Sequence, residues 1–85
     1  MEREYKFNGH QYWVTVEPAI NRANGETAFL AYVSDQRPGG LYYGALAKDG
    51  EGNVLLFKDE MTAFTNASAI KESELDRNQT SNGFH

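Results

Sequence analysis

The sequence contains no cysteine, only two prolines among 85 residues, and no long apolar run. Without cysteine, a disulfide framework and a thiolate metal site are both excluded, so stability must come from packing alone. Small secreted domains usually depend on disulfides, and we therefore expect a cytoplasmic protein. No apolar stretch approaches the ~20 residues of a membrane helix. Residues 1–6 alternate in charge where a signal peptide has an apolar run, so we expect neither secretion nor membrane insertion.

Basic residues are also few. Eight Lys and Arg side chains oppose twelve Asp and Glu side chains, and the formal net charge is −4. Residues 59–77 hold five acidic and two basic side chains, which is −3 of that total. Affinity for nucleic-acid backbones needs clustered Lys and Arg, so the composition disfavours a nucleic-acid partner. The acidic segment fits a solvated helix face, with a basic protein partner as the alternative.

The clearest local pattern is Asn8-Gly9 between two runs rich in aromatic residues. Asn-Gly favours a type I′ turn, so residues 3–7 and 10–14 are expected to form a β-hairpin closed by a two-residue turn. Its register places Phe7 opposite His10. Alternation then gives an apolar face and a mixed face. The apolar face holds Tyr5, Phe7, Tyr12, Val14 and Val16, and the mixed face holds Glu4, Lys6, Gln11, Trp13 and Thr15.

Further strands follow, separated by turn-forming residues. Pro18 is expected to end the second strand, because proline cannot donate in a ladder, and residues 18–25 read as a turn. Residues 27–34 carry apolar side chains on both faces and predict a central strand. Residues 41–48 and 54–58 predict a second hairpin, in which Gly44 indicates a bulge or a close backbone approach.

From Asp59 the apolar period becomes helical. Asp59 is a suitable N-cap, and the expected apolar stripe is Ala63, Phe64, Ala67, Ile70 and Leu75. We therefore predict an α+β fold: an antiparallel sheet of about five strands, made of two hairpins plus a central strand, followed by one C-terminal helix packed on one face. Residues 1–77 would form a single domain, and residues 78–85, which show no period, a flexible tail.

Catalytic and metal-binding patterns are weak. His10 and His85 have no partner at ligand spacing, and we expect no metal and no cofactor. Residues 49–60 resemble a calcium loop in part, but Val54 stands where that loop needs glycine. No serine lies in a nucleophile motif. Glu17 and Asp35, expected near strand ends, are the only carboxylate pair we advance for a small hydrolase.

One helix can cover only one face of a sheet, so the second face is expected to expose aromatic area. Exposed apolar patches usually mark interaction sites, and Trp, Tyr and Arg are frequent anchors. The expected partner-binding residues are Trp13, Tyr32, Arg37 and Tyr42. Alternatively, the tail or residues 18–25 fold over that face. An exposed edge strand could also pair with a second chain.

No motif is specific enough to indicate a family. The leading hypothesis is a small non-enzymatic interaction module that binds a protein partner or forms a homodimer. One concrete version is a small acidic inhibitor encoded by a mobile element, which rests on size and acidity alone. The alternatives are a single-stranded nucleic-acid binder that uses the exposed aromatic residues, and a small hydrolase that uses Glu17 or Asp35.

Overall fold

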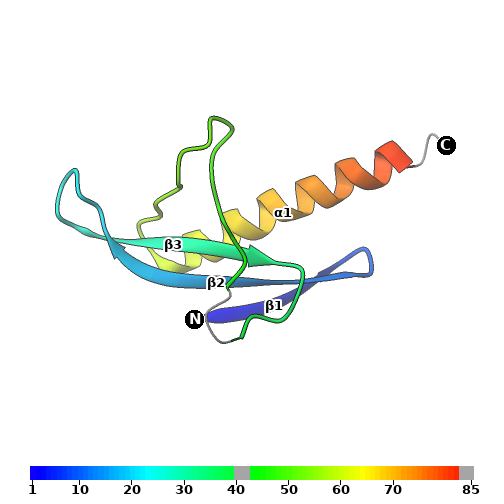
Figure 1. Ribbon diagram of the computed structural model, residues 1–85, viewed down its shortest axis with the longest axis horizontal. Helices are drawn as coiled ribbons and strands as arrows, with labels where there is room; N and C mark the ends of the chain where they lie inside the picture. Colours follow the sequence, from blue (N-terminus) through cyan, green and yellow to red (C-terminus); the bar gives the residue numbers. More distant parts are fainter. Residues whose placement is uncertain (40–42, 83–85) are drawn as a thin grey trace.

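A computed structural model describes residues 1–39 and 43–82. The strands are β1 (Glu2–Phe7), β2 (His10–Ile20), β3 (Thr27–Ser34) and β4 (Ala45–Leu46), and the helix is α1 (Glu60–Asn82). The strands form one antiparallel sheet in the order β1-β2-β3-β4, and α1 runs along one face of it (Figure 1). The predicted α+β class is confirmed, with four strands in place of about five.

The first hairpin forms as predicted. Asn8 and Gly9 have φ values of 50° and 81°, as a type I′ turn requires, and Phe7 pairs with His10. The same register pairs Tyr5 with Tyr12, whose rings stack with centroids 5.2 Å apart. The apolar side of this hairpin therefore faces the core.

The second strand continues past Pro18, which was wrongly expected to end it. Pro18 pairs with Phe29 inside β2. Met1 and Val16 exchange backbone hydrogen bonds, so the backbone groups of even-numbered residues in β2 point toward β1. Position 18 lies beyond the end of β1, where its nitrogen has no strand to face. Proline is tolerated at such an open edge.

Neither strand of the predicted second hairpin forms over its expected range: among the described residues of 41–48 only Ala45–Leu46 form the strand β4, and residues 54–58 form no strand. The Ala47 amide donates to the Ala31 carbonyl, and the chain then leaves the sheet through residues 48–56, which we call the excursion. It returns where Phe57 exchanges backbone hydrogen bonds with Phe29, on the same side of β3. A bridge between Lys48 and Val54 closes the excursion, which projects from the sheet (Figure 1). The fifth strand is thus a single bridge that continues the line of β4.

The helix begins at its predicted cap. An Asp59 carboxylate oxygen accepts from the Thr62 amide at 2.7 Å. We call the face of the sheet that α1 covers the helix face. The core cluster lies between this face and α1, and it consists of Tyr12, Val14, Val16, Ala31 and Ala47 from the sheet side and Ala63, Phe64 and Ala67 from the helix. Leu75 packs against this cluster, whereas Ile70 is 38% exposed and was wrongly placed in the stripe.

The helix is also longer than the sequence pattern indicated. It continues to Asn82, so the helical backbone extends past Arg77, where we expected the period to end. The division into a domain of residues 1–77 and a flexible tail remains a prediction. Within the described part of the chain, no helix combines the length and apolarity needed to cross a membrane.

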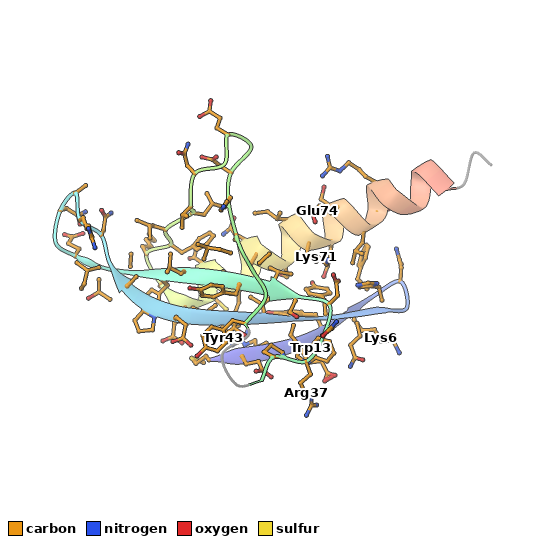
Figure 2. The ribbon with its side chains drawn as sticks, in the orientation of Figure 1. Lys6, Trp13, Arg37, Tyr43, Lys71 and Glu74 are labelled. Atoms are coloured by element: carbon orange, nitrogen blue, oxygen red, sulfur yellow. The ribbon has the colours of Figure 1, made fainter. Side chains whose placement is uncertain are left out.

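The opposite face, here called the loop face, is not the open aromatic surface that we expected. Trp13 is only 8% exposed, and Thr15 beside it is also buried. The connection after β3, whose described residues are 35–39 and 43–44, starts with a turn in which the Ser34 hydroxyl donates to the Gln36 carbonyl. It lies on the loop face, because the Tyr43 ring is 5.6 Å from the Tyr32 ring and Figure 2 shows Arg37 and Tyr43 on the same side as Trp13. Described residues of this connection, rather than residues 18–25, therefore lie over the loop face, and the last residues of the tail, 83–85, lie outside the described part of the chain.

Candidate interaction surface

The sheet has one long regular edge, formed by β1. Residues 3, 5 and 7 direct their backbone groups toward β2, because the Met1–Val16 and Phe7–His10 pairs set that alternation. The amides and carbonyls of residues 2, 4 and 6 therefore point outward. No strand among the described residues pairs with them. We call this row of backbone groups the β1 edge.

Side chains near the β1 edge alternate in charge and in face. Glu2, Glu4 and Lys6 project on the loop face and are exposed, whereas Tyr5 and Phe7 are half-buried on the helix face. Glu4 accepts a hydrogen bond from the Gln11 side chain. Arg3 lies with its guanidinium carbon 4.4 Å from the centre of the Phe64 ring. The edge is thus lined by both charges and by aromatic area.

The opposite edge has a different construction. β4 contributes only Ala45 and Leu46, and the excursion interrupts the strand before Phe57 resumes pairing. The Ala47 carbonyl at this edge accepts from the Leu55 amide within the excursion. A short, interrupted edge is a poor template for another strand, whereas the six-residue β1 edge is a good one.

A polar cluster joins three elements at the end of the sheet near the first turn. One Asp35 oxygen accepts from His10 Nε2 at 2.7 Å and from Lys71 Nζ at 2.8 Å. Nearby, the Tyr12 hydroxyl donates to the Glu72 carboxylate at 2.6 Å. Lys71 and Glu72 occupy the part of α1 where the apolar stripe was expected to continue. These contacts hold the second half of the helix to the sheet.

The electrostatics of this cluster are those of structural pairing. Hydrogen bonds from Lys71 and His10 lower the pKa of the Asp35 carboxyl below its ordinary value of 3.8. Burial and the adjacent Glu72 carboxylate raise the pKa of the Tyr12 hydroxyl. Both shifts move the pKa values of these groups further from neutral pH. A general acid or base works best with a pKa near the operating pH, so neither group is tuned for that role.

A shallow groove of about 290 Å³ lies between α1 and β4, beside this cluster. Its charged lining residues are Asp35, Lys48, Lys71 and Glu74, and Asp35 and Lys71 already pair with each other. Figure 2 shows Lys71 and Glu74 on the helix side of the sheet, with Trp13, Arg37 and Tyr43 on the other side. Over residues 1–39 and 43–82, no three His, Cys, Asp or Glu side chains gather as a metal site requires.

The predicted site residues are not assembled into one exposed patch. Trp13 is buried on the loop face, and Tyr32 is half-buried against Tyr43. Arg37 is exposed in the connection after β3, and Tyr42 lies outside the described residues. The contact surface proposed from sequence therefore has one exposed described member.

The carboxylates advanced for a hydrolase are also separated. Glu17 pairs with Leu30, whereas Asp35 follows Ser34, which pairs with Trp13. Four residues of strand separate these two levels of the sheet, or roughly 13 Å at about 3.3 Å per residue. The cluster of His10, Asp35 and Lys71 was missed from sequence. It depends on the register between β2 and β3, which the turn predicted over residues 18–25 did not give, because β2 continues to Ile20.

Comparison with known proteins gives no guide to the function: no family model, no curated protein and no solved structure matches this chain.

Proposed function

We propose that this protein is a small non-enzymatic interaction module that binds another polypeptide along the β1 edge. The observation that carries the proposal is the outward row of backbone groups at residues 2, 4 and 6, exposed over a six-residue regular strand. An added strand would satisfy those groups with main-chain hydrogen bonds, and alternate side chains would supply specificity. The absence of cysteine supports placing this binding in the reducing cytoplasm.

The alternatives find less support in the geometry. Base stacking needs exposed aromatic faces, but Trp13 is buried and Tyr32 is packed against Tyr43. A hydrolase using Glu17 with Asp35 would need the two carboxylates on either side of one bond, and the sheet register separates them. The acidic inhibitor remains a narrower version of the proposed function, resting on net charge as before.

Blocking the β1 edge tests the proposal. In Glu4→Pro the outward amide is lost and a ring projects from the edge, while the bonds from β1 to β2 are kept because residue 4 does not make them. Glu4→Ala removes the same carboxylate but keeps the amide, and it is the matched control. Each protein, immobilised, would be used to capture proteins from cells of its native source, together with an added untagged copy of the chain.

We expect wild type and Glu4→Ala to retain the same proteins and Glu4→Pro to lose them, with circular dichroism confirming that all three are folded. Proteins retained equally by Glu4→Pro would show that binding uses another surface. Nothing retained above an empty matrix, including the untagged copy, would contradict the interaction module itself.

A further inference from the structure

The β1 edge is complementary to itself. Two copies of β1 can pair antiparallel about a twofold axis only if outward residues lie opposite outward residues. One strand can therefore shift along the other only by two residues at a time, and each such shift moves the twofold axis by one residue. In the register centred on Tyr5, Glu4 lies opposite Lys6 of the partner subunit, and Lys6 lies opposite Glu4 of the partner subunit. Both ion pairs project on the loop face of the joined sheet.

Neighbouring registers are worse. A register centred on Glu4 keeps two opposite-charge pairs, between Glu2 and Lys6 of the partner subunit, but places the two Glu4 carboxylates directly opposite each other. One centred on Lys6 places two ammonium groups opposite each other. Like charges directly opposite are destabilising in a sheet. The charge order Glu4-Tyr5-Lys6 therefore selects the Tyr5 register.

The helix face adds aromatic complementarity in the same register. Tyr5 already stacks on Tyr12 with an interplanar angle of 11°, and Tyr5 of the partner subunit would lie directly across the new pairing. The twofold axis would thus join two stacked tyrosine pairs into one row of four rings. Arg3 would lie opposite Phe7 of the partner subunit. Aromatic cross-strand pairs stabilise sheets beyond their backbone hydrogen bonds.

Growth would stop at two copies. The other edge of each sheet is the short β4 line, broken by the excursion, and the described residues offer no comparable strand there for a third copy. From these observations, resting on the proposed function, we infer that the occupant of the β1 edge is a second copy of this chain. The product is a homodimer with one continuous eight-stranded sheet, centred on the Tyr5 pair.

Charge reversal tests the register. Sedimentation velocity over a concentration series would compare wild type with Glu4→Lys, Lys6→Glu and Glu2→Lys. We expect Glu4→Lys and Lys6→Glu each to weaken self-association about tenfold or more, because symmetry turns two attractive pairs into two repulsive ones. Glu2 lies opposite the turn of the partner subunit in this register, so Glu2→Lys should dimerise like wild type. In the register centred on Glu4, Glu2→Lys would face Lys6 of the partner subunit and weaken the dimer.

A mixture of the two defective variants supplies the decisive result. Glu4→Lys carries two basic residues at the contact and Lys6→Glu carries two acidic ones, so an equimolar mixture should form a heterodimer although neither variant dimerises well alone. No rescue on mixing, or Glu2→Lys as weak as Glu4→Lys, would overturn the register. A wild-type protein that stays monomeric at its highest soluble concentration would overturn self-pairing. If wild type then still captures another protein that Glu4→Pro loses, the proposed function stands and only the choice of partner is wrong.

Discussion

The two faces of the sheet are closed by different means. On the helix face, α1 covers Tyr12, Val14 and Val16 with side chains that are almost fully buried, including Ala63 and Phe64. The loop face is closed by the connection after β3, a segment without regular structure over residues 35–38. One face is held by apolar packing against a helix, and the other lies under a connection whose described residues 35–38 have no regular structure.

The two faces also differ in how well their buried side chains are packed and hydrogen-bonded. The loop face buries Thr15, whose hydroxyl is the one buried side-chain polar atom of the described residues without a hydrogen-bond partner. Leaving such a group unsatisfied costs roughly 1–3 kcal/mol. Trp13 is buried there but lies outside the core cluster. We therefore expect the helix face to carry most of the stability, and the loop face to be the part that can open without global unfolding.

Truncating the central helix residue should have the largest effect. Phe64 is almost fully buried in the core cluster, and the Arg3 guanidinium packs over its ring. Phe64→Ala should lower the free energy of unfolding by about 3–5 kcal/mol through lost burial and the cavity left behind. Urea unfolding followed by far-ultraviolet circular dichroism measures this. Phe64→Leu, which keeps most of the volume, should lose much less; equal losses in the two variants would argue against a packed helix face.

A smaller effect, confined to the loop face, is expected at Gly44. Its φ is +106°, and an added Cβ would lie 2.3 Å from the Val33 carbonyl oxygen, so backbone must move. Gly44→Ala should cost on the order of 2–3 kcal/mol and displace the end of the connection. Trp13 is the only tryptophan, so its emission should shift to the red and become more accessible to quenchers.

Gly50 provides the matched control for this change. It lies in the excursion, and an added Cβ there meets nothing within 4 Å. Gly50→Ala should leave both stability and Trp13 emission unchanged. A red shift of the same size in Gly50→Ala, or no shift in Gly44→Ala, would contradict the assignment of the connection as the cover of Trp13.

Features fixed by neighbouring residues could be predicted from sequence. The Asn8-Gly9 turn determined the register of β1 with β2, the Asp59 cap located the start of α1, and Gly44 marked the close approach to Val33. The register also divided the charges and aromatics of β1 between the two faces. That division is the basis of the candidate surface, although it was first read only as core patterning.

Features that depend on distant segments could not be predicted. Pro18 is accommodated because β1 ends before it, which is a property of two strand lengths. Phe57 resumes the line of β4 because the excursion closes on itself, a pairing that period-two alternation cannot distinguish from an ordinary hairpin. The loop face is reached by the connection between the strands predicted at 27–34 and 41–48, where Tyr43 meets Tyr32, and no local pattern indicated which face this connection would lie on. Each failure concerns where a segment packs rather than what it forms.

The smallest predicted effect concerns Asp35, where the two closures meet. Asp35 begins the connection that crosses the loop face, and its bond to Lys71 ties that connection to α1. Because its folded-state pKa lies below the ordinary value of 3.8, the folded state binds fewer protons than the unfolded state near that pH. The resulting stabilisation is present above the unfolded pKa and is lost as the pH falls through the folded pKa.

Replacing Asp35 with Asn removes this contribution at every pH. The carboxylate side chain is 58% exposed, so screening limits its effect, and we expect a loss of about 1 kcal/mol or less at pH 7. Urea titrations of wild type and Asp35→Asn from neutral pH downward should show this difference shrinking below about pH 4. Asp49 and Asp59, whose pKa values are also lowered, are common to both proteins and cancel in the comparison. A stability difference that stays constant into strong acid would mean that Asp35 acts through packing alone, and the electrostatic tie between the two faces would be wrong.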